Sequence, residues 1–167
     1  MKRNLHLLLI LSIIILGYSC KKSDPSNNNT VTYNNFKINS VTLNAFPATD
    51  NTGQTWDPFV NTDPDIYFKI DSAGTSIYDG STSAYQNNLT QSNLPFSWPA
   101  LPTPQIIRSF SSNYSISLFD ADNPSLGDSN DSMGQISFVM NDHKTGYPTS
   151  FQISSGAYSV TINGTWY

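Results

Sequence analysis

The stretch Tyr158-Ser-Val-Thr-Ile-Asn-Gly-Thr-Trp166 places apolar and polar side chains in alternation. Successive side chains of a strand point to opposite faces of a sheet, so this two-residue period is typical of a β-strand with one buried face. The residues on the predicted buried face are Tyr158, Val160, Ile162 and Trp166. The alternation therefore predicts a half-buried strand over residues 158–166.

The same alternation recurs along the chain, and helical periodicity is absent. Further strands are predicted over residues 36–45, 66–70, 114–119 and 136–140, with weaker ones over 76–79, 95–98 and 106–110. In the first of these the apolar phase shifts by one residue after Ile38, so a β-bulge is expected at Asn39-Ser40. Clusters of Gly, Pro, Asn, Asp and Ser separate the strands. The pattern predicts an all-β fold, an eight-stranded antiparallel β-sandwich.

The N-terminal residues 1–19 are predicted to be a secretory signal rather than part of the fold. Lys2 and Arg3 precede an apolar run over residues 7–16, which is too short to span a bilayer comfortably as a helix. Cys20 follows, and it is the only cysteine of the chain. The segment resembles a bacterial lipoprotein signal, in which the cysteine becomes the lipidated first residue. The resemblance implies a lipid anchor in the outer membrane of the cell envelope, facing the periplasm or the medium. Plain secretion and an uncleaved anchor are the alternatives.

Residues 20–32 read as a lipid-anchored flexible tether, and residues 33–167 as one compact domain. The tether is polar and rich in asparagine, without apolar periodicity. The domain has four basic residues against eleven aspartates, so its net charge is near −7. It has no basic stripe that would neutralise phosphates, and a nucleic-acid partner is therefore not expected. The domain also lacks cysteine, so its stability must come from buried aromatic and β-branched side chains.

Eight of the eleven aspartates of the domain fall in two short windows, where turns between strands are expected. One window holds Asp50, Asp57, Asp63 and Asp65, and the other holds Asp120, Asp122, Asp128 and Asp131. Two such loops at one end of a β-sandwich would line a cation site with oxygen atoms, and Ca²⁺ is its natural occupant. A single Asp in a turn more commonly caps the local backbone, so the prediction rests on the set.

Charge repulsion supports the prediction of a bound cation. Two carboxylates about 4 Å apart repel each other by about 4 kcal/mol at an effective dielectric constant near 20. Converging aspartates would force their loops apart or raise their own pKa values unless a cation neutralised them. Carboxylate oxygens are hard ligands that suit Ca²⁺, whereas Zn²⁺ prefers Cys or His, and His143 is the only histidine of the domain.

Several segments together resemble the C2 domain, an eight-stranded sandwich that binds Ca²⁺ with aspartates from its first and third loops. Asp65-Ile-Tyr-Phe-Lys-Ile70 looks like the segment that this family writes as Asp-Pro-Tyr-Val-Lys-Val. Asn93-Leu-Pro-Phe-Ser-Trp98 is similar to its Asn-Pro-x-Trp segment. Phe119-Asp-Ala-Asp122 and Asp131-Ser-Met-Gly134 look like its Asp-x-Asp and Asp-x-x-Gly pair. The resemblance covers residues 36–167.

The resemblance to the C2 domain implies a ligand set and a function. Its metal ligands would be Asp57, Asp65, Asp120, Asp122 and Asp131. Asp50 or Asp63 can take the place of Asp57, because the first loop is long. Asp128 can replace or supplement Asp131. The implied function is Ca²⁺-dependent binding, by an exported lipoprotein, to an anionic phospholipid or an acidic surface glycan. In the alternative, the domain is a structural or interaction subunit of a cell-surface assembly with a protein partner, and Ca²⁺ only stabilises its loops.

No motif of the sequence predicts an enzyme. A Gly-x-Ser-x-Gly elbow is absent, and Asp142-His143 has no recognisable nucleophile, so His143 reads as a surface residue. A third interpretation is a module for polysaccharide capture that uses Trp56, Trp98 and Trp166 as sugar platforms. Core positions are expected for Trp98 and Trp166 instead, and Trp56 is expected to fold back over the end of the sandwich.

Overall fold

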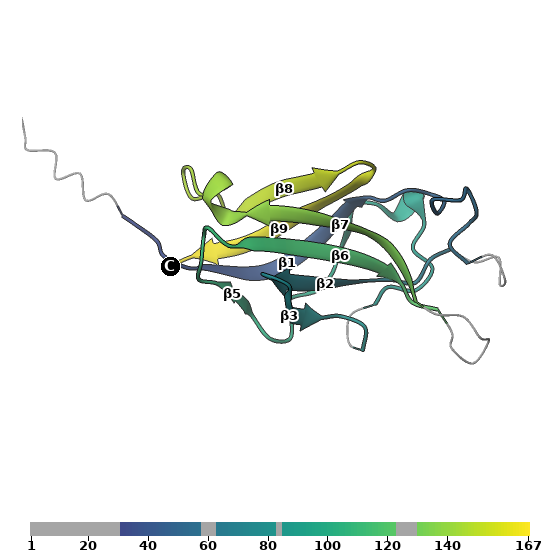
Figure 1. Cartoon of the computed structure of the whole chain (residues 1–167), viewed down its shortest axis with the longest axis horizontal. Helices are drawn as coiled ribbons and strands as arrows, with labels where there is room; N and C mark the ends of the chain where they lie inside the picture. Colours follow the sequence, from purple (N-terminus) through teal and green to yellow (C-terminus); the bar gives the residue numbers. More distant parts are fainter. Residues whose placement is uncertain (1–30, 58–62, 83–84, 123–129) are drawn as a thin grey trace, which may run out of the picture. The chain divides into compact units, whose positions relative to one another are not determined.

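The computed structural model describes residues 31–57, 63–82, 85–122 and 130–167. Tyr33–Tyr167 form one compact unit (Figure 1). The predicted signal at residues 1–19, Cys20 and most of the tether lie outside the described residues. Two short 3-10 turns, Gln91–Asn93 and Met140–Asp142, are the helical elements of the described part. No helix in that part has the length and apolarity needed to cross a membrane.

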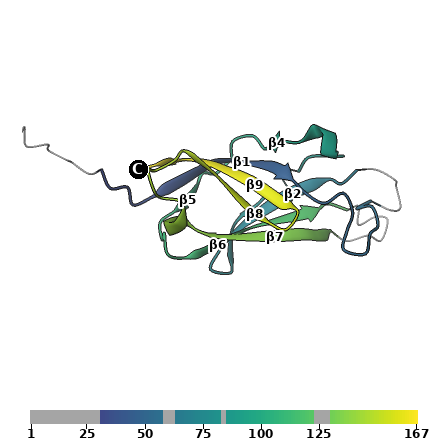
Figure 2. The same cartoon turned by 90° about the horizontal axis from the view of Figure 1, so that it is seen from above.

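Two antiparallel sheets form the two layers of the fold (Figure 2). The first sheet has the order β4-β1-β9-β8, and β5 also pairs with β1. Its strands are β1 (Phe36–Ala45), β4 (Phe96–Ser97), β5 (Gln105–Ile107), β8 (Ser150–Ser155) and β9 (Tyr158–Trp166). The second sheet has the order β3-β2-β6-β7. Its strands are β2 (Ile66–Ser72), β3 (Thr75–Asp79), β6 (Asn113–Asp120) and β7 (Asp131–Val139). The predicted all-β sandwich is confirmed.

The described residues form nine strands rather than the eight that the sequence predicted. The additional strand is β8, which has only two large apolar side chains, Phe151 and Ile153. Both are buried in the core, and β8 pairs with β9 along its whole length. Gly156 in the connecting turn has a φ of +58°, a left-handed conformation that favours glycine. The alternation within β8 is too short to predict a strand, and pairing with β9 determines its structure.

The bulge predicted in the first strand is confirmed. The register of β1 against β9 shifts between Ile38 and Ser40, and again between Leu43 and Ala45. A bulge adds one residue to one strand of a pair, so the apolar residues on both sides of the first shift face the core. These fully buried residues are Phe36, Ile38, Val41 and Leu43.

Aromatic side chains pack between the two sheets. Phe68 of β2 contacts Trp98, and Phe36 of β1 contacts Trp166 of β9, each with ring centroids 4.8 Å apart. Burial of a side chain such as Phe68 contributes about 1.5–3 kcal/mol to stability. The ring of Phe36 lies so close to Gly164 that a Cβ atom does not fit there. Core positions for Trp98 and Trp166 agree with the sequence prediction.

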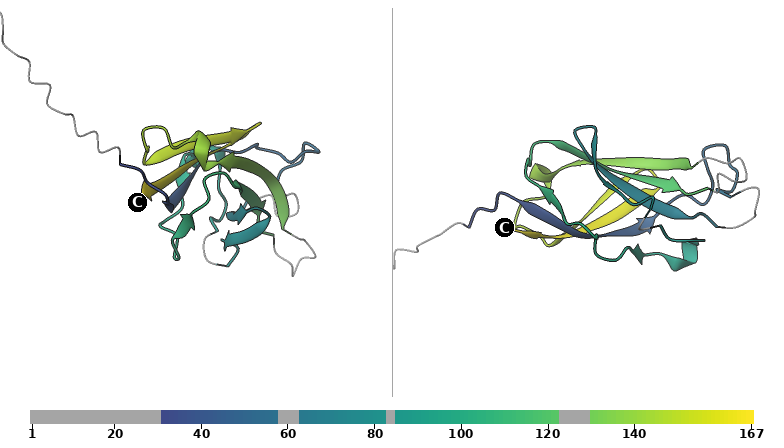
Figure 3. Two further views of the ribbon diagram at one scale, coloured as in Figure 1. Left: turned by 60° about the vertical axis from the view of Figure 1, so that its left-hand side comes forward. Right: turned by 90° about the horizontal axis from the view of Figure 1, so that it is seen from below.

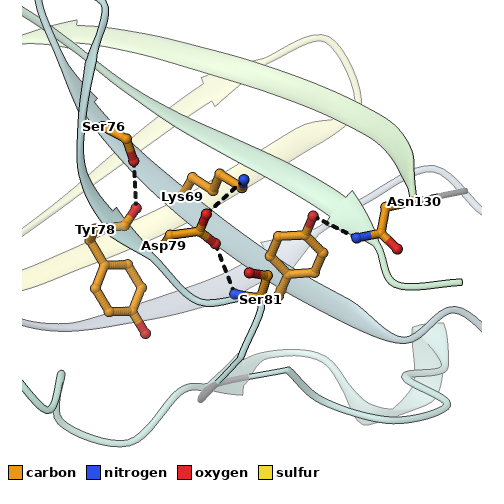
Figure 4. Close-up of polar contacts among 7 residues, drawn as sticks. Lys69, Ser76, Tyr78, Asp79, Ser81 and Asn130 are labelled. Atoms are coloured by element: carbon orange, nitrogen blue, oxygen red, sulfur yellow. Dashed lines mark hydrogen bonds and ion pairs between the residues drawn. The ribbon is translucent and has the colours of Figure 1, made fainter.

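The outer face of the second sheet carries a polar and aromatic group around Lys69 (Figure 4). Lys69 Nζ lies 2.8 Å from Asp79 Oδ2 of the neighbouring strand and 5.3 Å from the centre of the Phe119 ring. Asp79 also accepts a 3.0 Å hydrogen bond from the backbone N–H of Ser81. Both charged side chains are partly exposed, so we expect the ion pair to contribute less than about 1 kcal/mol.

The two aspartate-rich loops meet at one end of the sandwich because β2 and β6 are antiparallel neighbours. Ile66, the first residue of β2, pairs with Asp120, the last residue of β6. The loop that enters β2 and the loop that leaves β6 therefore lie at the same end. The end of β9 lies at the opposite end of the sandwich (Figure 3).

Candidate metal centre

Asp120 is the central residue of the candidate site because it is an acidic residue with no solvent exposure (0%). Ile116 and Leu118 of β6 face the core, and strand alternation places Asp120 on the same face. Carboxylates are almost never fully buried unless they are paired or bind a metal ion. The buried carboxylate of Asp120 is therefore expected to be either protonated or neutralised by a cation.

Only one carboxylate oxygen of Asp120 has a hydrogen-bond partner within the described ranges. Oδ1 accepts a 2.8 Å bond from the backbone N–H of Asp65, whereas Oδ2 is buried and accepts none there. Burial, together with the nearby charges of Asp57 and Asp122, raises the pKa of Asp120 to about 7, although the hydrogen bond from Asp65 opposes the shift. The ionised form is unfavourable here unless a cation compensates the charge.

Asp57 and Asp122 bring two further carboxylates to Asp120. One oxygen from each of the three residues lies within 4.8 Å of the others. Asp57 belongs to the loop between β1 and β2, Asp122 follows β6, and both are half-buried. At such separations each pair of charges repels by about 3–4 kcal/mol at an effective dielectric constant near 20. A group of this kind favours a divalent cation, or a proton in its absence.

Asp65 connects three segments around the group. Its backbone N–H donates to Asp120, and its carbonyl oxygen accepts a 2.8 Å bond from the N–H of Ala121. Its carboxylate accepts a 2.6 Å bond from the backbone N–H of Asn88. Asp65 thereby fixes the start of β2, the end of β6 and the turn at residues 87–88 relative to one another.

Asn130 holds the segment that carries Asp122, a role that sequence reasoning missed. Its side-chain oxygen accepts a 3.1 Å hydrogen bond from the N–H of Asp122, and its side-chain nitrogen donates to the Tyr67 hydroxyl at 3.1 Å. Figure 4 shows Asn130 beside the end of β6. Its position directly before Asp131 is the only sequence signal, and asparagine is common in loops for other reasons.

The structure brings three of the five predicted ligands together. These are Asp57, Asp120 and Asp122. Asp65 lies beside them, with a carboxylate oxygen bonded to the backbone at residue 88. Asp131 opens β7 opposite Asp120 in the strand register, but its side chain is exposed and lines a neighbouring cleft.

Of the three alternative ligands, Asp50 and Asp63 lie outside the group of three carboxylates. Asp50 accepts hydrogen bonds from the backbone N–H groups of Thr52 and Gln54, at 2.9 and 2.8 Å, and so holds its own turn. Asp63 is exposed and does not belong to the group of three. Asp128 lies outside the described residues.

The chemistry of the donor atoms favours a hard cation. Within the described ranges the group consists of carboxylates, without Cys or His. Ca²⁺ takes about six to eight oxygen ligands in flexible geometry, whereas Mg²⁺ demands a near-ideal octahedron and retains several waters. Three carboxylates, one from the loop after β1 and two from the end of β6 and the loop that follows it, fit Ca²⁺ better, with carbonyl and water oxygens to complete its coordination.

The tryptophans do not form exposed platforms. Trp98 and Trp166 are buried in the core, and a sugar platform needs an accessible ring face. Trp56 is also buried, and its Nε1 donates a 2.8 Å hydrogen bond to the carbonyl oxygen of Pro47. The prediction that Trp56 folds back over the end of the sandwich is therefore confirmed.

No protein-family model matches the chain, and no curated protein is significantly similar to it. These comparisons assign the chain to no family. The resemblance to the C2 domain rests on the sequence motifs named above and stays a prediction.

Proposed function

We propose that the protein is a Ca²⁺-binding, C2-like module of an exported lipoprotein, which uses the ion to bind an anionic phospholipid or an acidic surface glycan. Cys20 is the proposed lipid anchor in the outer membrane, and residues 20–32 are the proposed tether. The observation that supports this most is buried Asp120. The Oδ2 atom of Asp120 lacks a hydrogen-bond partner in the described part of the chain. The Asp120 carboxylate also lies beside the carboxylates of Asp57 and Asp122.

The ion would act as a bridge between an acidic domain and an acidic ligand. The domain has a net charge near −7, so an anionic headgroup or glycan is repelled by the bare protein. Ca²⁺ bound by Asp57, Asp120 and Asp122 would offset their repulsion and keep coordination positions open for ligand oxygens. Extracellular Ca²⁺ modules bind with dissociation constants of about 10⁻⁴–10⁻³ M, which suits a site outside the cell. Binding of this kind needs no catalytic group.

A structural role is the second candidate. Asp65 and Asp120 already join the ends of β2 and β6 through a backbone hydrogen bond. Ca²⁺ at Asp120 would tighten the same junction, and a protein partner in a surface assembly would then bind elsewhere on the sandwich.

Vesicle sedimentation separates the two functions. Purified protein is mixed with phosphatidylserine-containing or pure phosphatidylcholine vesicles, and in parallel with an insoluble acidic glycan, with Ca²⁺ or with chelator. Binding to the anionic material that chelator abolishes supports the bridging function. A melting temperature that rises with Ca²⁺, without binding to either material, supports the structural role.

Two matched variants complete the vesicle test. Asp120→Asn should shift the Ca²⁺ effect to higher Ca²⁺ concentration, whereas Asp142→Asn, which removes an exposed charge beyond the other end of β7, should leave it unchanged. If Ca²⁺ changes neither the sedimentation of the unmodified protein with vesicles or glycan nor its melting temperature, both functions are refuted.

A further inference from the structure

A separate cleft of about 340 Å³ lies next to the candidate metal centre. It is bounded by the loop after β1, the start of β7 and the start of β9, and so lies between the two sheets. Its lining residues are Asp50, Asn51, Trp56, Asp131, Ser132, Met133 and Tyr158. Clefts of about 300–1,000 Å³ commonly hold small ligands, and this volume is at the lower end of that range.

We propose that this cleft binds a single sugar ring that carries a protonated amine. The inference goes beyond Ca²⁺ binding and does not depend on it, because none of the three clustered carboxylates lines the cleft. Three features of the lining support it, namely negative charge without a neighbouring cationic residue, the fixed aromatic ring of Tyr158 and neutral hydrogen-bonding groups.

The charge of the cleft selects for a cationic ligand. Asp50 and Asp131 contribute two carboxylates, and no Lys, Arg or His occurs among the described lining residues. Burial tends to raise the pKa of Asp50, but hydrogen bonds from Thr52, Gln54 and Gly53 outweigh it and lower that pKa, so Asp50 stays ionised. An ammonium group that reaches either carboxylate would form a charge-assisted hydrogen bond, whereas an anionic ligand would be repelled.

The walls of the cleft are held in place by neighbouring backbone. A Cβ atom at Gly134 would lie 2.7 Å from the ring of Tyr158, so glycine at this position allows the ring to lie directly against β7. Trp56 is held by its bond to Pro47. Tyr158 is half-buried and gives the cleft its accessible aromatic face, which suits the apolar C–H face of a sugar ring. Trp56 and Met133 are buried and complete the apolar part of the lining.

The remaining groups distinguish an amino sugar from a simple amine or a neutral sugar. Asn51, Ser132 and the Tyr158 hydroxyl offer neutral donors and acceptors for ring hydroxyls. A small amine would leave these groups without ligand partners. A neutral sugar would leave the charges of Asp50 and Asp131 uncompensated. Only a ring with both hydroxyls and an ammonium group matches the whole lining.

Calorimetric titration with matched probes tests the inference on the purified protein, in chelator and again in Ca²⁺. The probes are D-glucosamine, N-acetyl-D-glucosamine, D-glucose and ethanolamine. Glucosamine should bind at least about tenfold more tightly than each of the others, since it alone combines charge-assisted bonds with the ring hydroxyls. The preference should be present in chelator, which separates this outcome from any failure of the Ca²⁺ site.

Variants locate the binding in the cleft. Asp131→Asn and Tyr158→Leu should each weaken glucosamine binding about tenfold, Tyr158→Phe should weaken it less, and Asp142→Asn should leave it unchanged. Equal affinity for glucosamine and its N-acetyl form would overturn the role of the amine. Ethanolamine binding as tightly as glucosamine would indicate a small-amine site, such as one for a lipid headgroup, and overturn the sugar. Absence of glucosamine binding, or binding that Asp131→Asn leaves intact, would also overturn the inference.

Discussion

The backbone N–H of Asp65 donates a 2.8 Å hydrogen bond to Oδ1 of Asp120, across the paired ends of β2 and β6. This bond uses one oxygen of the buried carboxylate, and Oδ2 has no hydrogen-bond partner among the described residues. One oxygen of Asp120 lies within 4.8 Å of one oxygen each of Asp57 and Asp122. Two residues predicted as equivalent ligands therefore occupy different positions. Asp120 presents an oxygen to the candidate cation, and Asp65 positions Asp120.

Substitution of the buried carboxylate should separate metal binding from folding. Asp120→Asn keeps the shape of the side chain and removes its charge, so Ca²⁺ affinity should fall by on the order of tenfold or more. The melting temperature in chelator should stay the same or rise, because a buried charge has been removed. Asp57→Asn should also weaken Ca²⁺ binding. Calorimetry and thermal melting measure both effects, and unchanged affinity in the two variants would refute the ligand assignment.

Acidification should stabilise the protein in the absence of Ca²⁺. The pKa of Asp120 is about 7 in the folded state, above the unfolded value of about 3.9. Between these values the folded state binds more protons than the unfolded chain, so its stability falls as pH rises from about 4 to about 7. Urea unfolding at pH 5 and pH 8 in chelator measures this fall.

The same pH comparison on Asp120→Asn provides the control. All other ionisable groups are shared by the two proteins, so the difference between their pH profiles isolates Asp120. The fall in stability should be smaller in the variant, and saturating Ca²⁺ should reduce it in the unmodified protein. Identical profiles would contradict the placement of Asp120 in a buried, negatively charged environment.

Asp65 substitutions should affect stability more than Ca²⁺ affinity. Asp65→Ala removes the carboxylate that accepts the bond from Asn88, which should cost about 1–2 kcal/mol of unfolding free energy. The bond to Asp120 comes from backbone N–H and survives the substitution. Ca²⁺ affinity should therefore change only about threefold. A loss as large as that of Asp120→Asn would instead make Asp65 a direct ligand.

Gly164 should tolerate no side chain. An added Cβ would collide with the Phe36 ring and the Lys37 carbonyl oxygen, so Gly164→Ala should cost about 2–3 kcal/mol. Gly156→Ala is the comparison, since the left-handed φ there costs about 1 kcal/mol while the space around it is open. Chemical unfolding of both variants measures the two losses of stability, and the loss should be larger for Gly164→Ala. Similar losses would contradict the close packing of β1 against β9.

The fold was predictable where apolar alternation was long. The strand at residues 158–166 and the bulge before Ser40 follow from side-chain phase alone. The strand β8 was missed because its two apolar residues are too few to establish a period. His143 read as a surface residue but is half-buried and stacks on Phe151, with ring centroids 4.3 Å apart. That contact depends on the unpredicted β8.

The candidate site was predictable as a region and less so as a set of atoms. Two loops rich in aspartate were expected at one end, and antiparallel pairing of β2 with β6 places them there. Sequence alone could not show that Asp65 donates a backbone bond while Asp120 is buried. These roles depend on side-chain direction at strand ends. The contribution of Asn130 depends likewise on a contact with Tyr67, 63 residues away in the chain.

Calorimetric titration of Ca²⁺ into the chelator-stripped protein, with Mg²⁺ as control, tests whether the group of Asp57, Asp120 and Asp122 binds Ca²⁺. We expect saturable binding that is selective for Ca²⁺ and raises the melting temperature. Absence of heat, together with a melting temperature that does not respond to Ca²⁺, would contradict this expectation. In that case, protonation rather than a metal ion would relieve the charge repulsion among Asp57, Asp120 and Asp122 in the folded protein.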